Sequence, residues 1–299
     1  MVKLDSTQVE KSTISRWKPV IEDWKHTFYL WRRTKLAMVG TFIVAGFLLM
    51  ALLAPLLAPY DPIKVDLVNR LKPPSKQFLF GTDQFGRDIL SRVLYGARVE
   101  VWIIFLVTVI SGTIGTAIGI VAGYFGGWID EILMRITDIF LAFPRLILAM
   151  ALSAVLGRGL TNAIIAISLV EWTVIARLAR AEAMRVKSQP FIEAAKAVGA
   201  SDLRILVLHV LPMCVSPVLV QLTMRMGTII LTAAGLGFLG LGAQPPTPEW
   251  GAIVSDGRSY LINHWWISTF PGLFIAVVVL GFNLLGDGIR DILDPRLRR

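Results

Sequence analysis

Segment 188–212 is a polar stretch between two long apolar runs, and its residue types suit docking to another protein. Glu193 offers a carboxylate that an arginine or a backbone amide of a partner can bind. Ala194 and Ala195 follow directly, and side chains no larger than a methyl group let a partner surface approach the backbone closely. We therefore expect a surface on which a second protein acts. Spacing alone leaves open a solvated amphipathic loop without a partner.

Local signals predict two short helices in this segment that meet at a sharp corner. Ser188 can cap the first helix, and Pro190 falls in its first turn, where an amide donor would be unpaired anyway. Gly199 suits the left-handed conformation that ends a helix, and a second helix then runs to Pro212. One face of the first helix would carry Phe191, Ala194, Ala195 and Val198.

The same segment contains a spaced pattern that identifies a family. Its parts are Glu193-Ala194-Ala195, Gly199 six positions after the glutamate, and Leu211-Pro212 twelve positions beyond the glycine. The pattern resembles the EAA loop of permease subunits of ABC importers. His209 replaces the usual aliphatic residue, as is common in the peptide-transport branch, and Met213 replaces the usual asparagine. The resemblance implies that loop 189–212 couples to separate ATPase subunits through Phe191, Glu193, Ala194, Ala195, Gly199, His209, Leu211 and Pro212.

A second pattern precedes the second apolar run. It comprises Gly81-Thr82-Asp83, Gly86-Arg87-Asp88, Ser91-Arg92 and Tyr95-Gly96-Ala97-Arg98. Glycine and aspartate at this density predict turns, and Asp88 can cap the helix that follows. The pattern also resembles the C-type permease of dipeptide, oligopeptide and nickel importers. Further matches at 172–180, 237–251 and 283–295 extend the resemblance over residues 36–299.

Composition independently indicates a membrane protein. Of the 299 residues, 55% are hydrophobic and 17% are charged, and the mean hydropathy is +0.65. Several runs reach the length of about 20 apolar residues that crosses a bilayer. We predict an all-α polytopic protein with spans near 36–59, 98–123, 132–156, 160–178, 213–240 and 267–289.

The distribution of lysine and arginine predicts the orientation. Basic residues are frequent in segments 1–35, 177–204 and 290–299, which share one side if there are six spans. We therefore place both termini and the EAA loop in the cytoplasm, although the external segment 60–97 is also basic. The net charge of +9 reflects this orientation, and no polar domain is left that could bind nucleic acid.

The family resemblance implies the fold and the division of the chain. It implies the type I ABC importer permease fold in a prokaryotic cytoplasmic (inner) membrane. We expect a cytoplasmic lead at 1–35, the first transmembrane helix with an external segment at 36–97, a permease core at 98–289 and a cytoplasmic tail at 290–299. The lead, rich in tryptophan and basic residues, can lie along the membrane lipid.

Missing motifs exclude several functions. The sequence has no GxxxxGK[ST] phosphate loop, so the chain is predicted to be non-catalytic, with no cofactor of its own. It has no metal motif such as HExxH, and Cys214 is its single cysteine. The resemblance therefore implies partners: a B-type permease, two ATP-binding subunits that hold ATP and magnesium, and an extracytoplasmic substrate-binding protein. Peptides are the expected cargo, and nickel or glutathione stays open.

Charged residues inside spans are costly when they face lipid, so they indicate a pathway or a pairing. Candidates for lining the pathway are Arg225, Met224, Gln221 and Glu171; Arg135, Asp138 and Arg145 are further charges within the spans. Pairing with one another or with the sister subunit is the alternative that we favour. A proton-coupled secondary transporter with Glu171 or Asp138 as carrier is the second function considered, but it leaves the EAA loop unexplained.

The external segments 60–97 and 244–260 are predicted to dock the substrate-binding protein. Three prolines stiffen the second segment, and its tryptophan can anchor in a partner. The alternative is that the two segments pack on each other and plug the pore. Candidate docking residues are Thr247, Trp250, Asp83 and Arg87.

Overall fold

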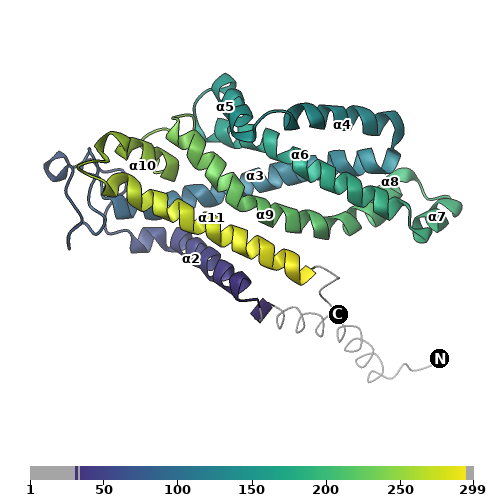
Figure 1. The fold of residues 1–299 in the computed structure, drawn as a ribbon, viewed down its shortest axis with the longest axis horizontal. Coiled ribbons are helices and arrows are strands. Elements are labelled where there is room, and N and C mark those ends of the chain that lie inside the picture. Colours follow the sequence, from purple (N-terminus) through teal and green to yellow (C-terminus); the bar gives the residue numbers. More distant parts are fainter. Residues whose placement is uncertain (1–30, 33, 294–299) are drawn as a thin grey trace, which may run out of the picture.

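The computed structural model describes residues 31, 32 and 34–293, and within them the fold is helical (Figure 1). The amino-terminal lead assigned to the membrane surface therefore lies almost wholly outside the described residues. The long helices are α2 (Lys35–Leu57), α3 (Ile89–Phe125), α4 (Gly127–Leu141), α5 (Arg145–Leu156), α6 (Leu160–Lys187), α9 (Leu211–Phe238) and α11 (Trp266–Leu293). The short elements are η1 (Leu67–Asn69), α7 (Pro190–Ala197), α8 (Asp202–Ile205), the π-helical turn η2 (Leu206–Val210), α10 (Trp250–Gly257) and η3 (Arg258–Tyr260).

Five helical segments are long and apolar enough to cross a membrane, which confirms the predicted fold class. They are α2, α3, α6, the continuous segment 202–238 and α11. The predicted third span, 132–156, is bent, because α4 and α5 meet there at 92°. Pro144 precedes α5, and a proline has no amide to continue the hydrogen-bond ladder from α4. The pair forms a sixth span only as a broken one.

Two other helix boundaries differ from the predicted spans. α3 begins at Ile89, nine residues earlier than expected, because Asp88 caps it as predicted. The Asp88 carboxylate accepts a hydrogen bond from the Ser91 amide at 2.7 Å. α6 continues nine residues beyond the expected end, to Lys187, so the fourth span leads almost directly into the polar segment.

α3 and α6 pack with their backbones in contact. Gly115, Gly119 and Gly123 recur every four residues along α3 and face α6. A Cβ atom on each would lie only 2.5, 2.3 and 2.4 Å from the carbonyl oxygens of three α6 residues, Trp172, Ala176 and Arg180. In lipid, where apolar surface gains little from leaving its solvent, such small-residue contacts are a main source of helix association.

The polar segments lie at opposite ends of the bundle (Figure 1). The start of α2, the end of α11 and helix α7 share one end, whereas α10 and the chain between α2 and α3 lie at the other. The two termini themselves lie outside the described residues, so the sequence prediction that they share a side with the EAA loop stays a prediction. We call the end that carries α7 the coupling end and the other the α10 end.

Replacement of Gly119 by leucine should prevent normal packing of α3 on α6, because the new side chain would meet the backbone of Ala176. Overpacking of this kind costs about 3 kcal/mol. We expect a large loss of monodisperse protein in detergent, measured by gel filtration and thermal melting. Gly46→Leu is the matched control, because nothing lies within 4 Å of a Cβ at that helical glycine. Normal melting of both variants would contradict the close contact.

Candidate functional site

Helix α7 is anchored to the bundle on one side and exposed on the other. Ile192 is fully buried and packs in a core cluster with Ile205 and Val210. On the other side Phe191 is 44% exposed and Val198 83% exposed. Exposed apolar side chains at helical spacing beside a firm anchor are suited to a partner surface. Glu193 and Ala194 are exposed with them, while Ala195 is half-buried.

The end of α7 confirms one local prediction. Gly199 has φ +83°, the left-handed conformation expected at this position, and its surroundings leave open space for a Cβ. Any strain of a larger residue there would therefore come from the backbone conformation and not from crowding.

Two local predictions for this segment are wrong. Ser188 does not cap α7: the cap position is Gln189, without a side-chain hydrogen bond, and the Ser188 hydroxyl donates instead to the Arg185 carbonyl at the end of α6. The second helix does not stop at Pro212. It runs from α8 through the π-helical turn into α9, and the wide turn lies directly before the proline, which cannot donate to a carbonyl of the preceding turn.

Tyr124 attaches residues 189–212, which we call the coupling segment, to the end of α3. The sequence did not reveal this contact. Its hydroxyl donates to the Asp202 carboxylate at 2.6 Å. Its ring lies beneath the ammonium groups of Lys187 and Lys196, at 5.7 and 5.2 Å from the centroid. One buried aromatic residue therefore contacts the end of α6, α7 and α8 together. The one signal in the sequence for this contact was a tyrosine at the end of a predicted span.

Within the coupling segment, two of the predicted residues contact each other. The rings of Phe191 and His209 meet edge to face with centroids 6.2 Å apart. Leu211 and Pro212 are exposed at the start of α9, farther along the same continuous helix. The structure thus brings the first helix of the loop against the helix that leads into the fifth span.

Three ion pairs inside the bundle connect neighbouring helices. Arg225 of α9 binds Glu171 of α6 through two nitrogens, the closest contact being 2.6 Å. The favoured alternative, mutual pairing, is confirmed for these two residues. Asp138 binds Arg177 at 2.6 Å. It does not pair with Arg135, which lies 3.6 Å from Glu131 instead.

Two hollows border these helices. One of about 330 Å³ is lined by Gln221 and Met224, two predicted pathway residues, together with Leu178, Ser216, Pro217, Val220 and Arg290. Neither Glu171 nor Arg225 lines it. A larger hollow of about 640 Å³ between α3 and the segment α8 to α9 has no charged residue in its lining. Its chemistry suits another membrane helix or lipid, and not a charged cargo.

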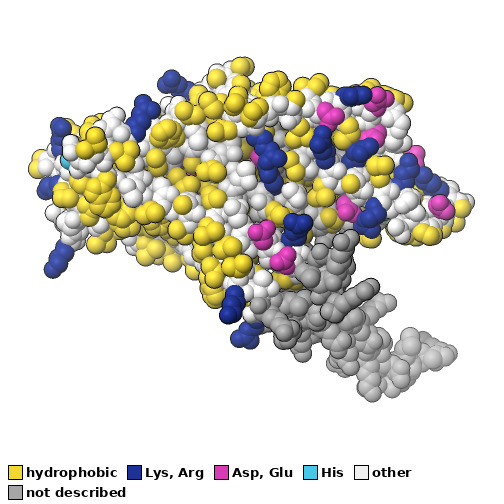
Figure 2. All heavy atoms as spheres, in the orientation of Figure 1, with side chains coloured by type: hydrophobic (Ala, Val, Ile, Leu, Met, Phe, Trp, Pro, Cys, Tyr) yellow, Lys and Arg dark blue, Asp and Glu magenta, His cyan; other side chains and the backbone are white. Residues whose placement is uncertain are grey.

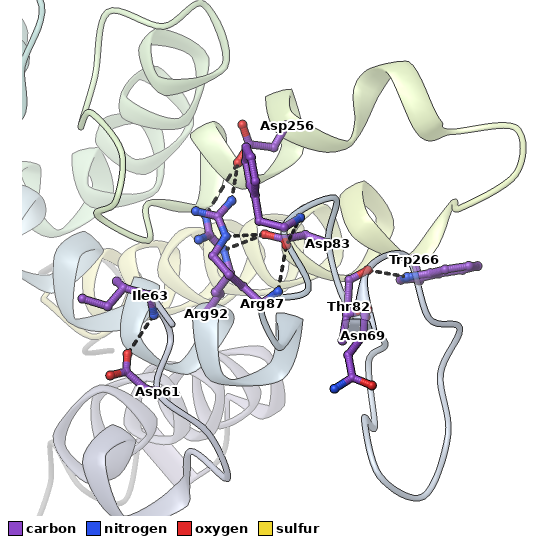
Figure 3. A network of polar contacts seen from close by, with 10 residues as sticks. Asp61, Ile63, Asn69, Thr82, Asp83, Arg87, Arg92, Asp256 and Trp266 are labelled. Carbon is purple, nitrogen blue, oxygen red and sulfur yellow. Dashed lines mark hydrogen bonds and ion pairs between the residues drawn. The ribbon is translucent and has the colours of Figure 1, made fainter. Parts of the chain in front are cut away.

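The outer docking residues are mostly in the interior, which corrects the prediction for three of them. Trp250 is fully buried, and its indole nitrogen donates to the Val93 carbonyl at 2.9 Å. Asp83 and Arg87 are buried together, 2.6 Å apart (Figure 3). Thr247 is half-buried. The reason is that the two outer segments pack on each other, as the alternative stated.

A shared cluster of charges joins these outer segments. Asp256 of α10 lies 3.3 Å from Arg87 and 3.6 Å from Arg92, and Arg92 lies 3.8 Å from Asp83 (Figure 3). Two arginines therefore face two aspartates across the junction between the α10 region and the start of α3. Burial raises the pKa of Asp256, while the two arginines act in the opposite direction.

A pair of buried glutamates lies next to this cluster. Glu100 of α3 and Glu249, which precedes α10, are both fully enclosed and contact each other. The two oxygens of Glu249 accept from the amides of Gly251 and Ala252 at 2.7 and 2.8 Å, so this side chain caps α10. A Cβ on Gly237 would collide with the same carboxylate. Two buried carboxyl groups in contact cannot both ionise readily, so we infer that they share a proton.

Two family descriptions match the chain. The one described as "Binding-protein-dependent transport system inner membrane component" matches residues 115–299. The one described as "N-terminal TM domain of oligopeptide transport permease C" matches residues 23–74. The two matches leave 75–114, which includes the charge cluster around Arg87, outside both.

Named relatives cover nearly the whole chain. It is 46% identical over 278 residues to the dipeptide transport system permease protein DppC of Alkalihalophilus pseudofirmus, which covers 93% of this chain and 91% of the relative. It is 44% identical over 268 residues to the probable D,D-dipeptide transport system permease protein DdpC of Escherichia coli K12, covering 90% of each. It is 45% identical over 276 residues to the glutathione transport system permease protein GsiD of Escherichia coli O157:H7, covering 92% and 91%.

The fold also resembles a solved structure. A chain of the inward-facing MetNI methionine ABC transporter superimposes with a TM-score of 0.56 at 19% identity, covering 68% of this chain and 97% of that one. At this identity the likeness concerns the fold alone.

The stability of the α10 end should fall as pH rises. Burial raises the pKa of Glu249 to about 7, so its contribution is complete below the ordinary value of 4.5 and is lost as pH rises through about 7. We expect the melting temperature to fall by roughly 5 °C between pH 5 and pH 7.5. Glu249→Gln, which stays uncharged, should reduce this fall.

Glu131→Gln is the control for this measurement, because that side chain is 69% exposed. Its melting temperature should follow that of the unmodified protein at both pH values. A Glu249→Gln variant with the full fall would show that the shared proton does not affect stability.

Proposed function

The chain belongs to the family of binding-protein-dependent transport system inner membrane components, as a permease subunit of an ABC importer, and we propose that its cargo is a small peptide. The relatives named above transport dipeptides, D,D-dipeptides or glutathione, and these compounds share a short peptide-like chain with a free carboxylate. This common chemistry supports peptides over a metal ion.

The observation that best supports a coupling role is the two-sided character of α7. One side is fixed by Ile192, and the opposite side presents Phe191, Ala194 and Val198 to a partner. We propose that a separate ATP-binding subunit seats on this face. ATP and magnesium would be held on two such subunits, and this chain would contribute no catalytic group.

The connections of α7 explain how movement there would reach the pathway. α6 leads into α7 through the two residues 188–189, and α8 continues through the π-helical turn into α9. Tyr124 adds the end of α3 to the same unit. A displacement of α7 would therefore move the ends of three long helices together, as a rigid-body, alternating-access mechanism requires.

The remaining partners and the orientation follow from the same proposal. The chain would supply half of a pore, with a homologous B-type permease as the other half. Its coupling end would lie in the cytoplasm, with both termini, and its α10 end would face the extracytoplasmic binding protein in a prokaryotic inner membrane. Because three of four docking residues are buried, the exposed Pro245 and Pro246 beside Thr247 are better candidates for that contact.

A proton-coupled carrier is less well supported. Glu171 and Asp138, its candidate proton carriers, are each already engaged by an arginine at 2.6 Å. The decisive experiment is peptide uptake into proteoliposomes that hold this chain, its sister permease, the two ATPases and the binding protein. Uptake should require ATP and survive collapse of the proton gradient. Uptake by this chain alone, driven by a proton gradient, would contradict the proposal.

Glu193→Lys and Gly199→Val should each abolish coupled transport while the protein still inserts. The first reverses a charge on the exposed face of α7, and the second forces a β-branched residue into a left-handed conformation. We expect uptake and binding-protein-stimulated ATP hydrolysis to fall at least about tenfold, as for loss of one charge-assisted contact. Glu131→Lys, the same charge reversal at an exposed site of α4, should behave normally. Normal transport by both coupling variants would remove the coupling assignment.

A further inference from the structure

Three charged side chains from three different helices come together where α4 bends into α5. Glu171 and Arg225 form the ion pair between α6 and α9. Arg145 is the first residue of α5, a helix that packs on both α6 and α9, and it lies near enough to Arg225 and Glu171 for their charges to act on it. The group therefore holds two cations and one anion within helices that cross the membrane.

Arg145 has no partner of its own among residues 34–293. It makes no ion pair within 4.0 Å and no side-chain hydrogen bond there, although its side chain is only partly exposed. Arg225 already binds both oxygens of Glu171, so that carboxylate is fully engaged. An uncompensated cation inside a membrane protein is costly, and such residues commonly mark a substrate pathway.

The other acidic side chains of the neighbouring helices are committed elsewhere. Asp138 binds Arg177, and Asp130 binds Arg180 through two contacts of 2.5 and 2.6 Å. Glu131 lies beside Arg135. Glu182, the remaining acidic residue of α6, binds Arg185, so α4 and α6 offer no free carboxylate to Arg145, and we infer that the compensating anion comes from another molecule.

The position of Arg145 strengthens the attraction for an anion. The first residue of a helix stands at the positive end of the helix dipole, and α5 has no side-chain cap there. Charged side chains gather over the α4 and α6 side of the molecule (Figure 2). A guanidinium is the group best able to bind a carboxylate through two parallel hydrogen bonds.

We propose that Arg145, supported by the Glu171–Arg225 pair, binds the carboxylate of the peptide as it passes through the membrane. The inference rests on the proposed function and adds a site and a recognised group to it. Glu171 has a positioning role, because it holds Arg225 beside Arg145. Its negative charge also leaves the group of three side chains with a net charge of +1. A single half-exposed arginine binds weakly enough for the cargo to leave again.

The first test measures uptake of a peptide and of its carboxyl-terminal amide into proteoliposomes that contain the whole importer. Each uptake rate is divided by the measured occupancy of the binding protein. Arg145→Gln should lower uptake of the free acid at least about tenfold, the worth of one charge-assisted hydrogen bond, and change uptake of the amide less than about twofold. Arg145→Lys should keep most of the preference for the acid. Arg135→Gln, at an exposed arginine with its own partner, is the matched control and should behave like the unmodified importer.

The outcomes separate the site from the function on which it rests. If the unmodified importer shows no ATP-dependent uptake, the proposed function fails. If it transports but Arg145→Gln slows acid and amide equally, the site fails, and a structural pairing of Arg145 with an acidic residue of the sister permease is favoured. Unchanged uptake in Arg145→Gln would also overturn the site.

The second test locates the carboxylate directly and does not depend on whether the binding protein accepts the amide. Two peptides carry a photoreactive diazirine, one on the carboxyl-terminal residue and one on the amino-terminal residue, and are crosslinked during turnover. The carboxyl-terminal probe should label the first turn of α5 and the facing turns of α6 and α9 around Glu171 and Arg225. Labelling there by the amino-terminal probe alone, or by neither probe while uptake proceeds, would overturn the proposal.

Discussion

The close contact between the α3 and α6 backbones is the constraint on which most of the structure depends. Three glycines on α3 allow it, because backbone carbonyls of α6 occupy the space that a Cβ atom on each glycine would need. α3 carries Glu100 and Tyr124, while α6 carries Glu171 and leads into α7. Backbones in contact cannot slide past each other without collision. The contact therefore fixes how far apart the buried acid pair, the intramembrane ion pair and the coupling segment lie along the bundle axis.

Charged side chains are paired differently in the bundle and at its α10 end. In the bundle three ion pairs each join two helices, so these pairs also fix helix positions in a medium where solitary charges are costly. At the α10 end Asp83, Asp256, Arg87 and Arg92 form one network and close the two outer segments on each other. Against this background of paired charges, the lack of a partner for Arg145 is informative.

The coupling segment combines a firm attachment with a free face. Its buried side is tied to three long helices by Ile192, by Tyr124 and by the unbroken run from α8 into α9, so its exposed side is held in a defined orientation. A loop attached at its two ends alone would absorb a push by bending. Under the proposed coupling role, the attachment would let a push at the coupling end displace the bundle.

The sequence by itself determined those features that depend on residues close together along the chain. Hydropathy located the spans, Asp88 and Gly199 revealed a helix start and a helix end, and the EAA pattern predicted the coupling segment, because each signal lies within a short stretch of the chain. Tertiary structure alone decided the partners. The pairing of Asp138 with Arg177, the contact of Glu100 with Glu249 and the burial of Trp250 against Val93 join residues 39, 149 and 157 positions apart. No local pattern encodes such distances, since they follow from how the helices pack.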